Sequence, residues 1–427
     1  MNKQKLSLRL YQLVIMLITP ILILVFLIRS LNHKEYRQRL SERFGWTSSN
    51  LKPGGIVVHA ASVGEVIAVT PFVEELLVQQ PDLPITVTTF TPTGSAQVIK
   101  SFQNRVQHCY LPLDISFCVH LFFKFLKPKA VVLMETEIWP TLIQRCHKSG
   151  VKLLLINGRL SGKSLKSYKK ISWLIKPALN KFSAILCQSE DNLENFIHLG
   201  AKPEILSNSG NLKYDISITD DVQNKISKLQ QCIANDRTIM VVGSTHQGEE
   251  IQLINAFKRL KENHQNLLLV LVPRHPERFS SVGKICQEQE LNVVTRSSKQ
   301  QVNAEHDVWL IDTLGELLPV YALADICIVA GSFSDVGGHN PLEAALFSKP
   351  ILVGENMANF KDINAKFIAA KAIVQLKDNL DLTAELSTLI DDQALCIELG
   401  KNAEKLVKSN QGATVTSANT LKSLINI

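Results

Sequence analysis

A glutamate that could carry chemistry follows the first strand-like run after residue 50. Residues 56–60 read Ile-Val-Val-His-Ala and predict a buried strand, and the motif then continues to Glu65 at the start of a predicted helix. A carboxylate at the carboxyl end of a strand lies where the ligands of doubly wound sheets bind. The Ser62-x-x-Glu65 spacing is also typical of a helix capping box, and taken alone the motif favours capping. Gly64 suits a tight backbone or an approaching ligand.

Two further acids follow a second apolar run. Glu135 and Glu137 come directly after the predicted strand at residues 131–133 and precede Pro140. Carboxylates at the end of a buried strand are candidates for orienting a polar substrate. They also suit the start of a helix, where the helix dipole favours negative charge. The residues by themselves leave both interpretations open.

A loop at residues 157–164 superficially resembles a phosphate-binding P-loop. Only three residues separate its glycines, whereas the P-loop requires four, so we exclude hydrolysis of nucleoside triphosphates. Arg159, Ser161 and Lys163 leave an anion-binding loop as the remaining functional interpretation.

The second half of the chain contains two polar loops after apolar runs. Ser244 and Thr245 end one run ahead of a predicted helix, where small hydroxyl residues can hold a phosphate or simply cap the turn. Arg274 follows the run at 267–272, and its guanidinium fork matches two phosphate oxygens. His275 is a candidate base, or a spacer hydrogen-bonded near Glu277.

The loop that carries Gly337 and Gly338 is the most informative. The two glycines allow a ligand to approach the backbone, and Asn340 and Pro341 predict a helix start with Asn340 as its cap. Glu343, in the first turn, can accept hydrogen bonds from ribose hydroxyls. Capping explains Asn340, Pro341 and Glu343 but not the paired glycines, so the motif favours ligand binding.

Metal chemistry lacks its usual sequence signal. No Asp-x-Asp pair occurs, although metal-dependent sugar transferases commonly hold Mg²⁺ or Mn²⁺ with such a pair. The sequence therefore predicts no metal and no cofactor, with amides, arginines and helix dipoles stabilising a leaving phosphate.

The elements that must position these residues alternate between short apolar strands and helices. One series runs from residue 56 to 188 and a second from 239 to 353. This alternation predicts two doubly wound α/β domains with parallel sheets. We assign residues 1–32 to a membrane anchor, 33–215 to an N-terminal domain, 216–236 to a linker and 237–427 to a C-terminal domain, and expect a ligand cleft between the domains.

Charge and hydropathy place the N-terminal segment at a membrane. Residues 1–43 hold eight bases and two acids, which is most of the net charge of +7. The excess flanks the apolar run at 13–28, so it favours a membrane surface over nucleic acid. Residues 33–46 predict a basic amphipathic helix on lipid headgroups.

Topology follows from the same segment. No small-x-small cleavage pattern follows the run, and more bases follow it than precede it. The positive-inside rule then predicts a cytoplasmic body, and the eight dispersed cysteines predict free thiols. Whether the run spans the bilayer or lies in the interface is left open.

Taken together, these motifs resemble the 3-deoxy-D-manno-octulosonic acid (Kdo) transferase family over nearly the whole chain. The strings that carry the resemblance begin at Ala61, Glu135, Arg159, Pro273 and Gly337, and read ASVGE, ETEIWP, RLS, PRHPER and GGHNPLEA. Each string is moderately specific, and their order is strongly so. The resemblance implies a GT-B fold and an inverting glycosyltransferase that uses CMP-Kdo as donor and lipid IVA as acceptor.

The resemblance also implies roles for the site residues. Glu65 matches the family's catalytic base, and Glu137, with Glu135, would orient the acceptor or the donor. The donor nucleotide would contact Arg274, Asn340 and Glu343, with Ser244 and Thr245 near its phosphate. The enzyme would work on the cytoplasmic face of a Gram-negative inner membrane, in contact with its phospholipid, during lipopolysaccharide synthesis.

Two alternatives from other classes remain at this point. One is another membrane-associated GT-B transferase that uses a UDP-sugar. The other is a non-catalytic scaffold with a degenerate GT-B body, which the intact acids at Glu65 and Glu137 disfavour.

Overall fold

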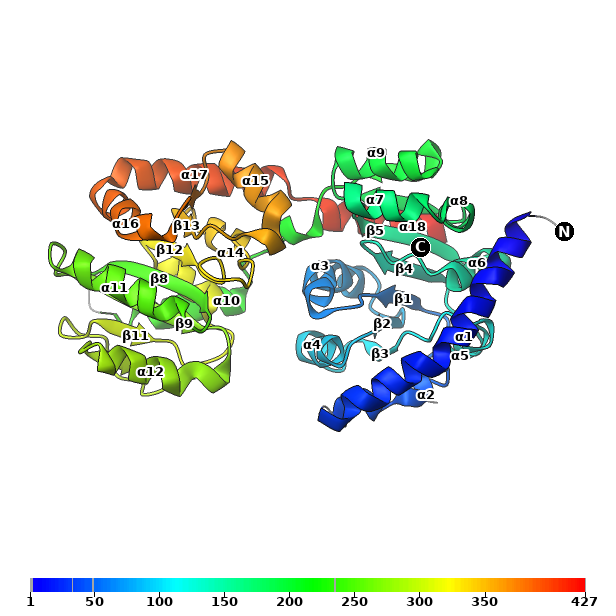
Figure 1. The fold of residues 1–427 in the computed structure, drawn as a ribbon, viewed down its shortest axis with the longest axis horizontal. Helices are drawn as coiled ribbons and strands as arrows, with labels where there is room; N and C mark the ends of the chain where they lie inside the picture. Colours follow the sequence, from blue (N-terminus) through cyan, green and yellow to red (C-terminus); the bar gives the residue numbers. More distant parts are fainter. Residues whose placement is uncertain (1–2, 33, 48–49, 234–235, 427) are drawn as a thin grey trace. The chain divides into compact units, whose positions relative to one another are not determined.

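The apolar runs of the first series assemble into a seven-stranded sheet whose neighbouring strands run parallel (Figure 1). This computed structural model describes residues 3–32, 34–47, 50–233 and 236–426. The strand order is β3-β2-β1-β4-β5-β6-β7. The strands are β1 (Ile56–His59), β2 (Ile85–Thr89), β3 (Gln107–Tyr110), β4 (Ala130–Met134), β5 (Lys152–Gly158), β6 (Ala184–Cys187) and β7 (Leu206–Asn208).

Helices cover both faces of this first sheet, which explains why its strands are almost continuously apolar. One hydrophobic cluster joins the sheet to α5 (Ser116–Leu126), α6 (Pro140–Ser149), α7 (Gly162–Lys169), α8 (Ser172–Leu179) and α9 (Glu190–Leu199). A second cluster on the opposite face joins it to α3 (Val63–Gln79), α4 (Pro92–Phe102) and α18 (Ala413–Ile425).

The second series forms another seven-stranded sheet with parallel neighbours, in the order β10-β11-β9-β8-β12-β13-β14. Its strands are β8 (Thr238–Thr245), β9 (Leu267–Pro273), β10 (Val293–Thr295), β11 (Val308–Leu310), β12 (Ile326–Val329), β13 (Ile351–Val353) and β14 (Val374–Gln375). Its helices are α10 (Asp220–Gln230), α11 (Glu249–Lys261), α12 (Phe279–Glu288), α13 (Leu317–Leu323), α14 (Leu342–Ala345), α15 (Lys361–Ala369), α16 (Leu382–Asp391) and α17 (Gln393–Ser409). The predicted pair of doubly wound α/β domains is thus confirmed.

Strand order determines where ligands can bind. In the first sheet the direction of winding reverses between β1 and β4, and in the second it reverses between β8 and β12. At such a switch point the loops beyond the carboxyl ends of the two strands diverge and leave a crevice. The motifs with Glu65 and Glu137 follow β1 and β4, and the loops at Thr245 and Gly331 follow β8 and β12.

The end of the chain returns to the first domain, which differs from the assignment of 237–427 to one C-terminal domain. The two compact units are Met1–Asp215 with Asn410–Ile427, and Ile216–Ser409. Helix α18 buries Ala418 and Leu421 in the core beside α3. The Asp215 carboxylate accepts hydrogen bonds from the backbone of Gly412 and Thr414. Residues 216–236, assigned as a linker, contain α10, which packs on α13 in the second unit.

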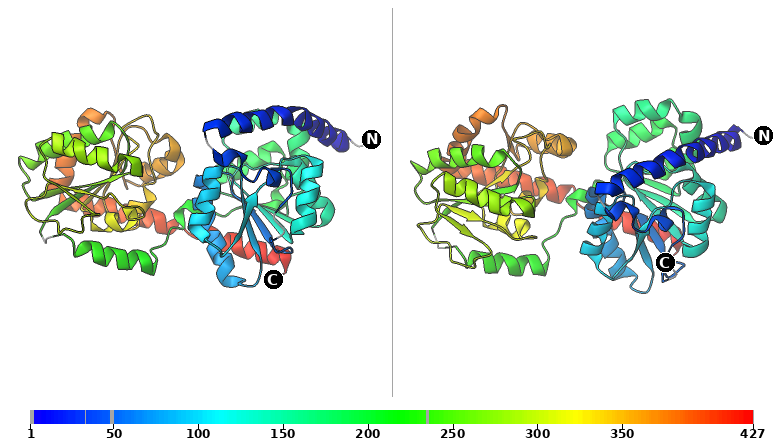
Figure 2. Two further views of the ribbon diagram at one scale, coloured as in Figure 1. Left: turned by 90° about the horizontal axis from the view of Figure 1, so that it is seen from below. Right: turned by 60° about the horizontal axis from the view of Figure 1, so that its bottom comes forward.

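The apolar N-terminal segment forms α1 (Lys3–Asn32), which lies along the surface of the first unit (Figure 2). By length and composition, residues Leu6–Leu31 could cross a membrane. A stripe of side chains three to four residues apart is at least half-buried against the body, whereas Leu13 and Leu17 are exposed. The Tyr11 hydroxyl donates a 2.9 Å hydrogen bond to Asp114 and ties the helix to the domain.

The expected amphipathic helix at 33–46 is wrong for the part of it that the structure describes. A 3₁₀ turn, η1 (Lys34–Arg37), and a single helical turn, α2 (Leu40–Arg43), occupy this stretch. Arg43 is 1% exposed and stacks 4.3 Å from the centre of the Tyr110 ring. Arg39 donates to the carbonyl of His108. Both arginines are therefore engaged within the first domain, because Tyr110 and His108 of β3 provide their partners.

Candidate active site

Glu65 is fixed at the start of α3 by a capping box. Ser62 caps the helix by accepting from the Glu65 backbone, and its hydroxyl donates a 3.0 Å hydrogen bond to Oε1 of Glu65. The backbone N–H of Ala61 donates to Oε2 at 2.9 Å. The capping interpretation is therefore confirmed, and it also gives the carboxylate one defined orientation at the strand end.

The electrostatic setting of Glu65 favours proton uptake. Burial raises the pKa of Glu65, although the hydrogen bond from Ala61 opposes this. The negative charges of Glu137 and Glu135 raise it further. Glu65, Glu135 and Glu137 are hereafter called the carboxylate site. A base is most effective when its pKa approaches the operating pH, so the shift is in the useful direction.

Glu137 is shifted the opposite way by its partners. Burial would raise its pKa, but His59 and the indole of Trp139 outweigh burial and lower it. Trp139 Nε1 donates to Oε2 of Glu137 at 2.7 Å, and His59 Nε2 lies 3.7 Å from the same oxygen. Two neighbouring carboxylates with pKa values pushed apart can take different roles.

His59 and Trp139 are partners that sequence reasoning missed. His59 is fully buried, and its Nδ1 lies 3.0 Å from the Thr88 hydroxyl. Trp139 packs at 6.0 Å, centre to centre, on Phe90. His59 lies just before the ASVGE string and Trp139 lies within ETEIWP. This closeness in sequence to the acids was the only signal that could have marked them as site residues. The contacts themselves depend on β1 lying between β2 and β4.

The loops after β4 and β5 are joined beside the carboxylate site. Glu135 adopts a left-handed conformation with φ 51°, and its carbonyl accepts from the backbone of Arg159 at 3.3 Å. The Thr136 hydroxyl donates to the Arg159 carbonyl at 2.6 Å. The Arg159 side chain is exposed. Space in front of Gly64 is open, since a Cβ there would meet no atom within 4 Å.

In the second unit, Glu249 organises the loops at the switch point, a role not predicted from the sequence. Its buried carboxylate accepts from the backbone of His246, Gly331 and Phe333 at 2.9–3.0 Å. These bonds tie the start of α11 to the glycine-containing loop after β12. A carboxylate that accepts three backbone hydrogen bonds holds such loops in one arrangement.

Three histidines gather at this edge and form what we call the histidine cluster. His246 and His339 stack with 5.0 Å between ring centres, and their Nε2 atoms are 2.8 Å apart. His275 meets His246 edge-on at 5.2 Å. Burial, reinforced by Arg274 and the other two histidines, lowers the pKa of His339 to about 4. The His339 imidazole is therefore neutral near pH 7.

Arg274 follows the end of β9 and has an exposed side chain. Its backbone N–H donates a hydrogen bond to the Thr245 carbonyl at 3.1 Å. Ser244 and Thr245 are themselves buried, and Ser244 has φ 63°. They support this edge through their backbone and packing. Sequence analysis placed the two hydroxyls near a phosphate, and that contact stays a prediction.

The glycine-rich loop is tightly packed. Gly337 and Gly338 have φ values of 95° and 77°, and a Cβ on Gly338 would lie 2.3 Å from the Met357 sulfur. Asn340 accepts from the Leu342 N–H at 3.2 Å and donates to Glu343 at 3.4 Å. The sequence predicted Pro341 as the first helical residue, but helix α14 begins one residue later, at Leu342, and is four residues long. Burial raises the pKa of Glu343, opposed by Asn340 and Arg274.

Among the residues that the structure describes, no group of three or more His, Cys, Asp or Glu side chains could hold a metal ion. The two sets of site residues each lie at the carboxyl edge of their own sheet. The cleft between domains expected from the sequence stays a prediction.

The two doubly wound domains, each with polar loops at its switch point, define a GT-B-type glycosyltransferase fold. A solved UDP-GlcNAc 2-epimerase from Neisseria meningitidis shares this fold with a TM-score of 0.56, at 15% identity, over 87% of this chain and 99% of that one. Residues 232–406 match the group 1 glycosyl transferases.

Comparison of sequences narrows this class. Residues 38–216 match the family described as 3-deoxy-D-manno-octulosonic-acid transferase. The transferase of that name from Haemophilus influenzae is 38% identical over 93% of this chain and 94% of its own length. Its counterpart from Rickettsia bellii is 31% identical over 94% and 96%. The chain belongs to the Kdo transferase family.

Proposed function

We propose that this enzyme transfers Kdo from CMP-Kdo to lipid IVA with inversion at the anomeric carbon. The observation that carries the proposal is the pair Glu65 and Glu137 at one switch point, with pKa values shifted in opposite directions. Membership of the Kdo transferase family supports the choice of transferred sugar.

In the proposed reaction Glu65 acts as the general base. It takes the proton of the acceptor hydroxyl while that oxygen forms a bond to the anomeric carbon. The bond from that carbon to the phosphate oxygen breaks, and CMP leaves with the electron pair. A single in-line displacement inverts the anomeric centre. Glu137, kept ionised by His59 and Trp139, orients the acceptor sugar or the donor, with Glu135 beside it.

The donor nucleotide belongs at the edge of the second sheet. Arg274 is exposed and suited to the phosphate, and its field acts on both His339 and Glu343. Asn340 and Glu343 form a hydrogen-bonded pair that can meet ribose or base. Gly337 and Gly338, which have positive φ and pack against Asn359 and Met357, shape the loop that would face the nucleotide, and His275 lies beside this edge.

The membrane setting is part of the same proposal. The exposed apolar face of α1 inserts in the cytoplasmic leaflet of the inner membrane, where a lipid acceptor resides. The half-buried opposite face, held by Tyr11, favours a helix that lies in the interface.

Mass spectrometry of lipid IVA after incubation with a CMP-Kdo-generating mixture tests the reaction. We expect a product heavier by one or more Kdo units. A parallel reaction with UDP-sugars tests the donor. Transfer from a UDP-sugar, with none from CMP-Kdo, would refute the proposal.

A further inference from the structure

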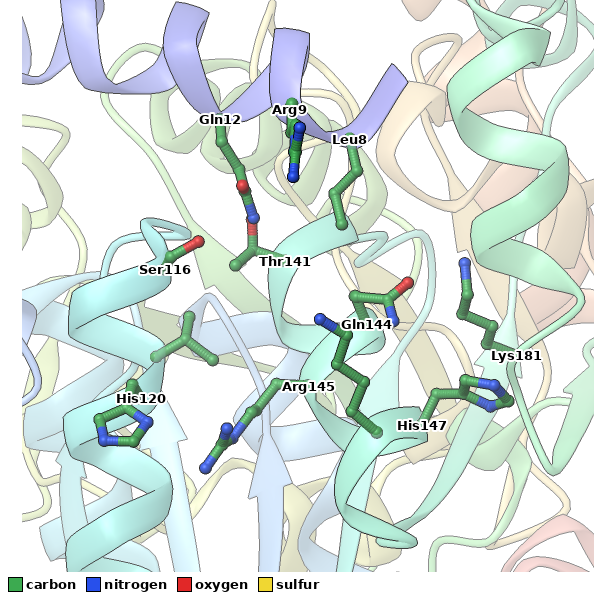
Figure 3. Close-up of a pocket in the computed structure, with 12 residues that line it drawn as sticks. Leu8, Arg9, Gln12, Ser116, His120, Thr141, Gln144, Arg145, His147 and Lys181 are labelled. Carbon is green, nitrogen blue, oxygen red and sulfur yellow. The ribbon is translucent and has the colours of Figure 1, made fainter. Parts of the chain in front are cut away.

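A cavity of about 620 Å³ lies between α1 and the outer surface of α5 and α6, with Lys181 at its side (Figure 3). It shares no residue with the carboxylate site or with the histidine cluster. Its walls come from α1, α5, α6 and the segment just after α8, so the cavity forms because α1 lies against the body.

The lining of this cavity is strongly cationic. Arginine or lysine side chains reach it from α1, from α6 and from the segment after α8, and two histidines add to them. No aspartate or glutamate stands among the lining residues. The basic lining residues are Arg9, Arg145, Lys148, Lys181, His120 and His147.

The acid near the cavity is engaged by hydrogen bonds. Asp114 is buried beside Tyr11 and Thr141 and is not one of the lining residues. Its oxygens accept from the Tyr11 hydroxyl and from the N–H groups of Thr141 and Leu142 at 2.8–2.9 Å. Asp114 therefore serves to fix α1 on the start of α6, which holds the cavity open.

Arg145 is the residue most suited to hold an anion there. Its Nε is buried and has no hydrogen-bond partner among the described residues, and its guanidinium lies 5.8 Å from the Phe123 ring. A guanidinium has five N–H donors, so an anion in the cavity can accept from those other than the buried Nε–H. A phosphate offers oxygens that match the fork of an arginine.

The position of the cavity distinguishes a lipid from a free anion. α1 lines the cavity with Leu8 and Gln12, and its opposite face carries the exposed apolar residues Leu10, Leu13 and Leu17. With that apolar face in the leaflet, as proposed above, the cavity lies on the head-group side of the helix. We propose that this cavity binds the phosphate of an anionic phospholipid head group and so sets the orientation of the domain on the membrane.

This inference does not depend on the donor or on the reaction, so binding is measured without either. The full chain is sedimented with phosphatidylcholine vesicles that contain or lack 30 mol% phosphatidylglycerol. We expect the double variant Arg145→Ala, Lys148→Ala to lose on the order of 10-fold or more in partitioning onto the anionic vesicles, since each cation near such a surface contributes appreciably. The control Lys100→Ala, Lys422→Ala makes the same charge change on α4 and α18, across the sheet.

A charge-conserving variant separates a specific site from diffuse attraction. Arg145→Lys keeps the charge but removes the fork, and we expect it to lose several-fold in partitioning with an unchanged melting temperature. Equal losses in the cavity variant and the control would overturn the proposal, as would wild-type partitioning of the cavity variant. Binding of inorganic phosphate without vesicles, lost in the double variant while vesicle binding persists, would overturn the lipid assignment.

Discussion

His59 Nε2 lies 3.7 Å from Oε2 of Glu137, while Nδ1 of the same ring is held 3.0 Å from the Thr88 hydroxyl. A fully buried imidazole thus links β2, through β1, to the loop after β4. This link helps to keep Glu137 ionised beside Glu65, whose pKa is raised. The acid–base properties of the site therefore depend on strand order as much as on the acids themselves.

Replacing Glu65 with Gln should lower kcat by about 10²-fold or more, because base catalysis typically contributes about 10²–10⁴-fold. Glutamine can maintain the capping box, so the melting temperature should change little. Single-turnover transfer and thermal melts check both statements. Near-normal turnover would assign Glu65 to capping alone.

Replacing Glu137 with Gln should shift the acid limb of the pH profile of kcat/KM to lower pH. Glu65 must be deprotonated to act as base, so activity falls as pH drops through its raised pKa. Removing the negative charge of Glu137 removes one cause of that raised pKa. Measuring kcat/KM of the variant and of the wild type across acidic pH locates the acid limb of each. A limb that stays in place would show that Glu65 does not limit activity at low pH.

Replacing Arg274 with Ala should weaken CMP binding by roughly 1.5–3 kcal/mol, the usual contribution of a hydrogen bond to a charged group. Isothermal titration with CMP measures the effect. Arg259→Ala, an exposed change of the same charge on α11, is the matched control. Unchanged affinity in Arg274→Ala would assign this arginine a structural role.

Transfer should survive EDTA, since the proposed contacts to the leaving phosphate come from Arg274 and the loop before α14. Initial rates with and without the chelator test this expectation. Inactivation that Mg²⁺ reverses would require a metal in the mechanism.

Deleting residues 1–30 should leave both units folded and transfer to a detergent-dispersed acceptor largely intact, because no proposed catalytic residue is removed. Asp114 loses the Tyr11 hydroxyl but keeps two backbone donors. Binding to anionic vesicles should fall steeply. Of the basic residues that remain near the truncated end, Arg39 and Arg43 are engaged within the fold and contribute little to the attraction.

Co-sedimentation of the truncated and full chains at low and high salt separates the apolar contribution from the ionic one, because salt screens only the latter. A truncated chain that binds as tightly as the full chain at high salt would show that α1 is not the anchor.

Short-range patterns in the sequence were sufficient for the strands and helices of the two α/β domains and for the capping of α3, but not for residues 33–46. Runs such as residues 131–133 are apolar because both faces of the sheet are covered, and the Ser62-x-x-Glu65 spacing acts within one helical turn. Ligands of doubly wound sheets bind beyond the carboxyl ends of the strands, so the motifs that follow strands could be predicted to gather at that edge.

Tertiary structure alone decided the partners of those motifs. The pairing of His59 with Glu137, the three backbone bonds to Glu249 and the bond from Tyr11 to Asp114 join residues that the fold brings together from different elements. The return of α18 to the first sheet is of the same kind. A local pattern shows that a helix has an apolar face, but it cannot show which sheet that face covers, because any complementary apolar surface buries it equally well.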